Sequence, residues 1–316
     1  MTAPLLQVEG LGVLYRSGAR RVQALADLGF SLARGEMLAL VGESGSGKST
    51  AARTIAGLAP LTTGRILIDG HDPAMAGKAE AKALRRRIQM VFQDPDASLN
   101  PAHSARAAIA EALIVRGVGS RPEIAAQTEA LAARVRLDPA LLTRKPRALS
   151  GGEKQRVAIA RALAMAPDLL IADESLSALD VSTQAEIADL FAALRRESGL
   201  AILFISHDLG MVAHLADRVL VLYAGRVVEA GPARAVLAAP RHPYARLLAD
   251  AVPDLDRGGL DLPAVALEEA GPGGAEAGCA FASRCPRRQS ICAQVPPLID
   301  GLDARAVACF FPLEDA

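Results

Sequence analysis

Short apolar runs alternate with helical patterns along most of the chain. Four of these runs have the length and composition of buried strands. Between the second and the third run, apolar residues recur at the i, i+3, i+4, i+7 spacing of an amphipathic helix. Alternation of strands and helices predicts an α/β fold with a mostly parallel sheet covered by helices. The strand runs are 37–41, 169–172, 201–205 and 219–223, and the helical positions are Ile187, Leu190, Phe191 and Leu194.

Three other stretches divide the chain. From about 98 to 148 the strand pattern disappears and an Ala/Leu/Arg-rich helical pattern replaces it, which indicates a helical insertion. Prolines gather from Pro240 onwards, and Glu269–Gly278 is rich in Gly and Ala, as linkers are. A short segment that contains all the cysteines follows this linker.

Composition narrows the class of protein. The chain has 316 residues, 51% of them apolar, with 35 basic and 35 acidic side chains. This balanced charge gives no electrostatic reason to expect nucleic acid or anionic lipid as a partner. No apolar run approaches the ~20 residues of a spanning helix, and the N-terminus does not read as a signal peptide. We therefore expect a soluble intracellular protein that reaches a membrane only through a partner.

The segment after the first strand run carries the strongest chemical motif. Gly42–Ser49 matches G-x-x-x-x-G-K-[ST] between a predicted strand and a predicted helix. Glycines let consecutive N–H groups wrap a phosphate, and the helix N-terminus adds partial positive charge. Lys48 would reach the β- and γ-phosphates, and the Ser49 hydroxyl would bind Mg²⁺. The predicted nucleotide-binding residues here are Gly42, Glu43, Ser44, Gly45, Ser46, Gly47, Lys48, Ser49 and Thr50.

Two acids end the second strand run. Asp173 and Glu174 follow Leu169–Ala172, and open α/β sheets bind ligands at the carboxyl ends of their strands. Asp173 would hold Mg²⁺, and Glu174 would act as general base towards the attacking water. Without the phosphate-binding motif, such a pair would be as well explained by a solvated loop.

A third motif opens the helical pattern of residues 157–164. In Leu149–Arg156, Ser150 is a plausible N-cap, and with the N–H groups of Gly151 and Gly152 it forms a second predicted anion site. Two such sites suit a head-to-tail pair of chains, in which each second site closes over the ATP of the other chain. The alternative is an ordinary capped helix.

With these motifs, residues 1 to about 235 resemble the ATP-binding subunits of ABC transporters. The resemblance implies that Tyr15 stacks on adenine and that Gln93 senses Mg²⁺ and the γ-phosphate and links to a transmembrane partner. It also implies that Asp180 belongs to a loop crossing the dimer seam and that His207 contacts the γ-phosphate. Gln93 and His207 thereby join Lys48 and Glu174 as predicted catalytic residues, and Gln93 joins Ser49 and Asp173 at Mg²⁺.

Each assignment has a simpler alternative, and the chain departs from the family in two places. Tyr15 would otherwise only pack an edge, His207 would cap the next helix, and Gln93 would be a surface polar residue. Ser175 stands where the family usually has proline, which would stiffen the turn that aims the general base. Glu153 stands where glutamine is commonest.

Three further stretches resemble the oligopeptide/dipeptide importers, and the second of their two paired ATPase subunits in particular. They are Phe92–Pro95 with Ser98–Pro101, Ser177–Ser182, and Pro240–Tyr244. The resemblance implies an ATPase domain over 1–235 with an antiparallel edge subdomain near Tyr15, a helical subdomain at about 94–150, and a small cysteine-bearing C-terminal extension over 236–316.

The cysteines leave three interpretations open. Cys279, Cys285, Cys292 and Cys309 are spaced without the C-x-x-C pair that would indicate zinc. In a reducing cytosol a cluster of cysteines indicates metal ligation before disulfides. The resemblance implies a [4Fe–4S] cluster as one option, and a metal ion or four thiols that pack a small core are the others. Arg305 stands where relatives often carry a histidine.

Taken together, the resemblance implies an ATPase that uses ATP and Mg²⁺ and lies peripherally at the cytoplasmic face of the membrane. Its expected partners are a related ATPase subunit (or a second copy of itself), two permease subunits and an external solute-binding protein. The expected solutes are oligopeptides or dipeptides, with nickel or another solute as the alternative. An ABC ATPase that acts without a membrane, and a regulatory module that barely turns ATP over, remain further alternatives.

Overall fold

A computed structural model describes residues 3–17, 20–175, 179–251, 278–301 and 304–314. Its contacts divide the chain into two compact units, and the chain passes between them several times. The first unit comprises 1–5, 32–36 and 68–204, and the second comprises 6–31, 37–67 and 205–316.

The first unit contains a strip of parallel sheet and most of the helices. Strands β7, β6 and β5 lie in that order, and β5 pairs with β6 in parallel, with Val91 opposite Ala172. All five residues of β6 are buried, because helices cover both faces of such a strand. The strands are β5 (Ile88–Val91), β6 (Leu169–Asp173) and β7 (Ala201–Ile205), whose last residue belongs to the second unit.

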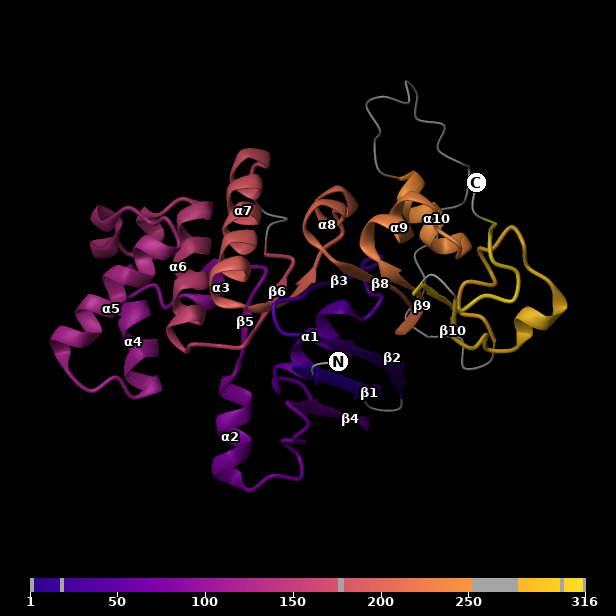
Figure 1. Cartoon of the computed structure of the whole chain (residues 1–316), viewed down its shortest axis with the longest axis horizontal. Coiled ribbons are helices and arrows are strands. Elements are labelled where there is room, and N and C mark those ends of the chain that lie inside the picture. The colour runs from indigo at the N-terminus through magenta and orange to yellow at the C-terminus, as the bar shows by residue number, and fades with distance from the viewer. Residues whose placement is uncertain (1–2, 18–19, 176–178, 252–277, 302–303, 315–316) are drawn as a thin grey trace. The chain divides into compact units, whose positions relative to one another are not determined.

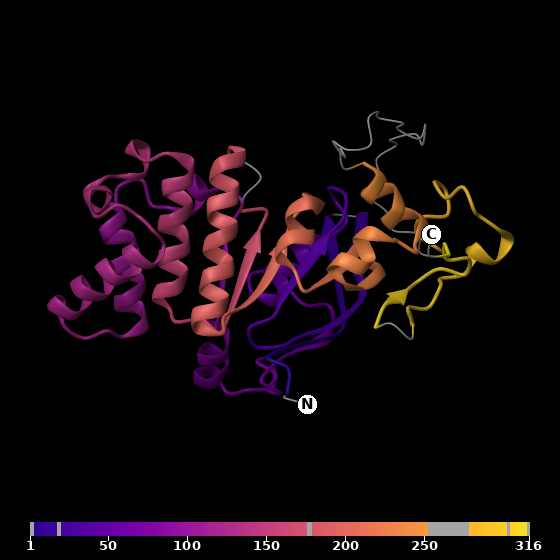
Figure 2. The same cartoon turned by 45° about the horizontal axis from the view of Figure 1, so that its top comes forward.

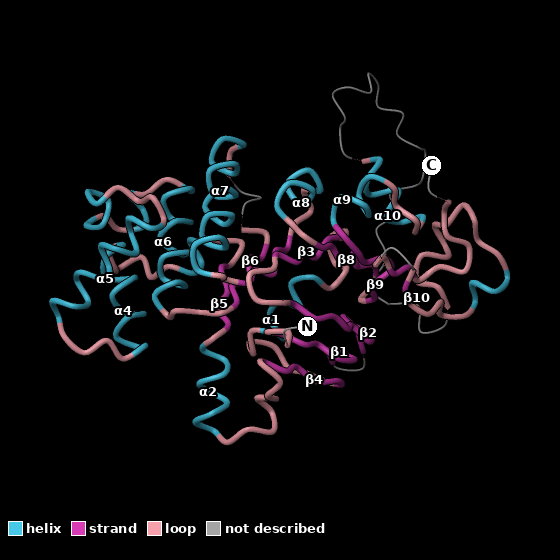
Figure 3. Tube along the Cα trace, viewed as in Figure 1, coloured by secondary structure: helices cyan, strands magenta, loops and turns pink. Residues whose placement is uncertain are grey.

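Between β5 and β6 the described chain is helical. Helices α4, α5 and α6 pack side by side (Figures 1 and 2), and the whole interval between the two strands contains only helices and loops (Figure 3). The helices of this unit are α2 (Lys78–Arg86), α3 (Pro95–Ser98), α4 (Ala105–Arg116), α5 (Arg121–Arg134), α6 (Gly151–Ala164) and α7 (Val181–Ser198), with 3₁₀ turns at Pro139–Thr143 and Pro146–Ala148.

The second unit contains two sheets. One has the strand order β2-β1-β4. In the other, β3 pairs with β8 in parallel, and β9, β11 and β10 then follow in antiparallel order. The strands are β1 (Leu6–Ser17), β2 (Arg20–Leu32), β3 (Met37–Val41), β4 (Thr63–Ile68), β8 (Arg218–Tyr223), β9 (Arg226–Pro232), β10 (Ile299–Asp300) and β11 (Ala306–Val307).

The helices of the second unit connect these strands and continue into the C-terminal segment. Helix α1 follows β3, and α9 and α10 pack beside β9 (Figure 1). The bounds are α1 (Lys48–Ile55), α8 (Leu209–Leu215), α9 (Ala233–Ala238), α10 (Pro243–Asp250) and a 3₁₀ turn at Ser290–Ala293.

The four predicted strands are confirmed within a residue at each end, as is the amphipathic helix, which is α7. In the second unit, the sheet that contains β3 and β8 is mixed. Strands β9, β11 and β10 extend it in antiparallel order, and β11 and β10 belong to the cysteine-bearing segment. The predicted linker lies outside the described residues except for Gly278. Among the described helices, none is both long and apolar enough to cross a bilayer.

Candidate functional site

The glycine-rich motif forms a tight loop between β3 and α1. Gly42 has φ 152°, and a Cβ there would lie 2.2 Å from the Leu222 carbonyl oxygen. Gly47 has φ 106°, and a Cβ there would meet the Ala24 carbonyl oxygen at 2.5 Å. Both positions therefore need glycine, because a side chain would be strained and would collide with backbone. The glycines of the motif let the chain close tightly around whatever the loop binds.

Two observations in this loop suit an anion. Helix α1 begins after Gly47 and has no side-chain N-cap bond, so its first N–H groups are not satisfied by a cap. Ser46 is buried, and its hydroxyl has no hydrogen-bond partner among the described residues. Both features fit a loop whose polar groups are completed by a phosphate, and the predicted ATP therefore fits the residues present.

Lys48 lies inside the loop. Its side chain is buried, and Nζ donates to the carbonyl oxygens of Gly42 at 2.7 Å and Glu43 at 2.9 Å. The ammonium is thus held against the loop rather than extended into solvent. Ser49 and Thr50 follow in the first turn of α1, and both are half-buried.

Three predicted residues of the first unit, Gln93, Asp173 and Glu174, lie at the carboxyl ends of its parallel strands. Because β5 and β6 are parallel and in register, their carboxyl ends lie together. Gln93 is an exposed loop residue just after β5, Asp173 is the buried last residue of β6, and Glu174 is the half-buried next residue. The sequence prediction that these three belong to one site is compatible with this placement.

The turn after β6 has an unusual backbone. Glu174 has φ 42°, in the left-handed region that non-glycine residues rarely occupy. Ser175 is buried, and its hydroxyl has no hydrogen-bond partner among the described residues. The serine that replaces the family's usual proline therefore does not hold this turn by a hydrogen bond of its side chain.

Helix α6 begins with a capping box. Ser150 is the N-cap: its hydroxyl accepts from Glu153 N at 3.3 Å, and Glu153 Oε2 accepts from Ser150 N at 2.7 Å. The predicted N-cap is confirmed, and Glu153, noted from sequence only as a departure from glutamine, has a structural role. Gly151 is exposed at the first position of the helix. A Cβ on Gly152 would lie 2.5 Å from Thr183 Cγ2, so glycine lets α6 approach α7.

Asp180 begins α7. Its carboxylate accepts from Thr183 N at 3.0 Å and from Thr183 Oγ1 at 2.8 Å, which makes it the N-cap. The hydrogen bond from the Thr183 backbone lowers the pKa of Asp180. Ser177 and Ala178 of the predicted seam loop lie outside the described residues.

Tyr15 and His207 both lie in the second unit. Tyr15 is on β1, the middle strand of its sheet, with 40% of its surface exposed, which leaves the ring open to a stacking partner. His207 is exposed and lies before α8. Asp208 caps that helix by accepting from Met211 N at 3.0 Å, so the alternative of a capping role for His207 is wrong.

Helix α6 is fastened to the segment that follows Gln93. Lys154 Nζ contacts Asp96 Oδ2 at 2.8 Å, and Arg161 Nη1 donates to Ser98 O at 2.5 Å. The helix that starts at Ser150 and the segment after Gln93 are therefore joined by two polar contacts. Ser98 belongs to the motif Phe92–Pro95 with Ser98–Pro101, so this motif takes part in the contact.

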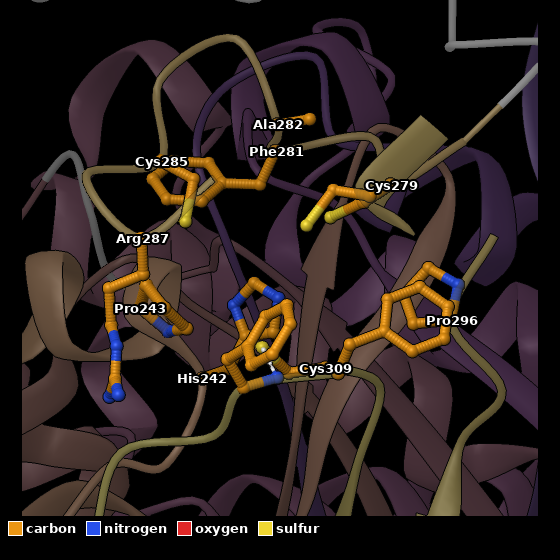
Figure 4. A pocket seen from close by; sticks show the side chains of 12 residues that line it. His242, Pro243, Cys279, Phe281, Ala282, Cys285, Arg287, Pro296 and Cys309 are labelled. Atoms are coloured by element: carbon orange, nitrogen blue, oxygen red, sulfur yellow. Dashed lines mark hydrogen bonds between the residues drawn. The ribbon is translucent and has the colours of Figure 1, made fainter. Parts of the chain in front are cut away.

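The four cysteines line one pocket in the C-terminal segment. In Figure 4 the sulfur atoms of Cys279, Cys285 and Cys309 point into the same space, and Cys292 also lines it. Burial raises the pKa of Cys279 and of Cys309 and so favours the neutral thiols. Among the described residues, no group of His, Cys, Asp or Glu side chains is arranged to hold a metal ion.

A buried ion pair joins the C-terminal extension (residues 236–316, called the tail below) to strand β9. Strand β11 pairs with β9, and Arg305 Nη2 lies 2.8 Å from Glu229 Oε1, with both side chains almost completely buried. The carboxylate of Glu229 also accepts from the backbone N–H groups of Arg241 and His242. The arginine that replaces a frequent histidine thus anchors the extension, a role that sequence reasoning missed.

A second contact joins the tail to the glycine-rich loop. Arg284 donates to both carboxylate oxygens of Glu43, at 2.8 and 3.0 Å. The Tyr244 hydroxyl accepts from Glu43 N at 2.7 Å. Aromatic rings of Tyr223, Tyr244 and Phe281 pack together beneath this contact. No local sequence signal predicted it.

Comparisons with known proteins agree on one family. The profile described as "ABC transporter" matches residues 25–177, and that described as "Oligopeptide/dipeptide transporter, C-terminal region" matches 228–292. A probable peptide ABC transporter ATP-binding protein of Sinorhizobium fredii is 45% identical, over 98% of this chain and 90% of its own. A putative peptide import ATP-binding protein of Brucella abortus is 44% identical, over 98% of this chain and 92% of its own.

Solved structures give the same result. A dimeric ATP-binding cassette in a post-hydrolysis state, bound to ADP and Pi, is 31% identical with a TM-score of 0.66, over 72% of this chain and 99% of its own. A structure of cbiO1 from Clostridium perfringens, part of the ABC transporter complex cbiONQ, is 32% identical with a TM-score of 0.67, over 75% of this chain and 92% of its own. The chain belongs to the ATP-binding proteins of ABC transporters, in the group that carries the oligopeptide/dipeptide transporter C-terminal region.

Proposed function

We propose that this chain hydrolyses ATP to drive the import of oligopeptides or dipeptides through a membrane permease. The observation that carries the proposal is the loop at Gly42–Ser49. Its helix has no side-chain N-cap, its buried Ser46 hydroxyl has no hydrogen-bond partner in the described part of the chain, and Lys48 lies inside it. Membership of the family makes ATP hydrolysis the expected reaction. The names of the relatives and the match of the C-terminal region support a peptide as the solute.

The residues of the loop bind the triphosphate. Lys48 and the loop amides hold the phosphates, and Tyr15 stacks on the adenine. Ser49, Asp173 and Gln93 would hold Mg²⁺, which supplies Lewis-acid stabilisation of the phosphates when bound. Glu174 takes a proton from the attacking water as general base, and His207 stabilises the charge that develops.

The partner chain completes each site. Ser150, Gly151 and Gly152 at the start of α6 face the ATP of a second ATPase subunit, and Asp180 lies near the seam. A related chain is the favoured second subunit, and a second copy is the alternative. Two permease subunits and an external solute-binding protein complete the assembly, in which this chain lies peripherally at the cytoplasmic face of the membrane. The contact Lys154–Asp96 would carry the motion of α6 to the segment after Gln93, which would contact the permease.

The functional division that we propose lies near residue 235, with a helical subdomain at about 94–150. Residue 235 lies inside α9 (Ala233–Ala238). The match to the oligopeptide/dipeptide transporter C-terminal region begins earlier, at residue 228. The extension over 236–316 therefore shares a helix with the ATPase domain.

Uptake in cells tests the proposed function. A strain that lacks this gene is expected to lose uptake of labelled di- and oligopeptides and to regain it with the wild-type gene. A gene that carries Glu174→Gln should not restore uptake. The control Glu197→Gln, which makes the same chemical change at an exposed position on α7, should restore it. Normal peptide uptake in the deletion strain, with loss of nickel uptake instead, would assign another solute.

For the four cysteines we infer a soft-metal or [4Fe–4S] site. All four line one pocket, as ligands of one group must. The thiols as they stand do not form a coordinating group, so binding would require the surrounding loops to move. Protein purified without oxygen is expected to contain iron and inorganic sulfide, and Cys309→Ser should lose both. Metal-free wild-type protein with all four thiols titratable would leave the cysteines as packing residues.

A further inference from the structure

Glu43 places a carboxylate inside the loop that we propose binds a triphosphate. Charges of the same sign repel, and solvent screens this repulsion less where the charges are partly buried. The Glu43 carbonyl oxygen also lies 2.9 Å from Lys48 Nζ. An unpaired carboxylate on this loop residue would oppose the negative charge of the phosphates.

Arg284 neutralises this carboxylate. Its guanidinium makes a two-pronged contact with the Glu43 carboxylate, at 2.8 and 3.0 Å, which is the strongest geometry for this pair. The Arg284 side chain is only 9% exposed and that of Glu43 29% exposed, so solvent screens the pair little. The hydrogen bonds to Glu43 raise the pKa of Arg284, which stays charged throughout the useful pH range.

Aromatic rings fix the arginine in this position. The guanidinium carbon lies 5.6 Å from the centre of the Phe281 ring and 5.9 Å from that of Tyr223. Cations over ring faces are attracted by the ring quadrupole. Phe281 also lines the cysteine pocket, and Cys285 is the next residue after Arg284. The arginine is therefore held by the cysteine-bearing segment and presented to the loop.

We propose that Arg284 is a positioning residue that neutralises Glu43 and thereby sets the affinity of the phosphate loop for ATP. This inference rests on the proposed function, because it assumes that the loop binds a polyphosphate. It assigns the C-terminal extension a part in the nucleotide site, beyond its contact with the rest of the fold.

A purely structural role, in which Arg284 only attaches the tail, makes a different prediction. The tail has other attachments: β11 pairs with β9, Arg305 pairs with the buried Glu229, and Tyr244 accepts from Glu43 N. Loss of Arg284 is therefore expected to leave the tail in place. If the arginine acts by charge, removal of the Glu43 charge must compensate for its loss, whereas lost packing cannot be compensated in this way.

The first measurement is ATP affinity of the full-length chain at equilibrium. Arg284→Ala is expected to weaken ATP binding about fivefold, as one uncompensated charge near the phosphates would. The loss should shrink as salt is added. The matched control is Arg288→Ala, which removes the same charge from an exposed position in the same segment and should leave affinity unchanged. Arg284→Lys keeps the charge and should retain most of the affinity.

The second measurement is rescue. Glu43→Gln combined with Arg284→Ala is expected to bind ATP within about twofold of Glu43→Gln alone. In steady state, Arg284→Ala should raise KM for ATP and leave kcat nearly unchanged, because the interaction is equal in ground and transition states. Unchanged affinity in Arg284→Ala, or a double variant as weak as Arg284→Ala, would overturn the inference. If the wild-type chain itself binds no ATP, that result would overturn both this inference and the proposed function.

Discussion

Glu174→Gln is expected to slow ATP hydrolysis by about 10²–10⁴-fold, the range typical for loss of a general base. Glutamine keeps the size of the side chain but cannot accept a proton from water. Glu174 follows directly on Asp173 at the end of β6, and its left-handed backbone is a conformation that only a specific tertiary setting maintains. We expect ATP binding itself to remain within a few-fold of the wild type, because the phosphate loop is unchanged.

Single-turnover phosphate release in the assembled transporter measures this effect, with nucleotide affinity measured beside it. Glu197→Gln is the matched control, because it makes the same chemical change on the exposed end of α7. Equal phosphate release by wild type and Glu174→Gln would remove Glu174 from its role. A variant that also lost ATP binding would show that the substitution disturbs the loop around β6 rather than the chemistry.

Local signals predicted the framework of this fold. A strand buried on both faces must be apolar at every position, and Met37–Val41 is therefore recognisable without any partner. Ser150 was recognisable as an N-cap because capping depends on residues three apart. The same spacing also contained the signal for Glu153: S-x-x-E before a helix is a capping box, and it explains the glutamate better than a comparison with glutamine does.

Contacts between distant segments had no such signal. Arg284 and Glu43 are 241 residues apart, and Arg305 and Glu229 are 76 apart. The chain has 35 acidic side chains, so the sequence alone does not indicate which carboxylate a given arginine contacts. The folded structure determines that partner. The link between the cysteine segment and the phosphate loop, and the convergence of the four thiols on one pocket, therefore appeared only in the structure. The sequence led to a proposed set of nucleotide-site residues, but it did not indicate the distant residues that contact and support them.

Lys48→Ala is expected to weaken ATP binding by about tenfold to hundredfold, as loss of a charged hydrogen-bond donor to phosphate does. The lysine is the one cation placed inside the loop by the motif, and its ammonium is already enclosed by the carbonyl groups of Gly42 and Glu43. Hydrolysis should fall at least as far, because the same charge stabilises the γ-phosphate as it leaves.

The substitution also has a structural cost that must be separated from binding. Without the ammonium, two carbonyl oxygens of the loop lose a donor, which costs about 1–3 kcal/mol where they stay buried. Thermal unfolding without nucleotide measures that cost, and ATP affinity should be compared well below the lower transition. Lys82→Ala, an exposed lysine on α2, is the matched control. Wild-type affinity in a folded Lys48→Ala chain would mean that the loop at Gly42–Ser49 is not where the triphosphate binds. Every assignment in the nucleotide site would then be wrong, because each one takes its meaning from a phosphate held in that loop.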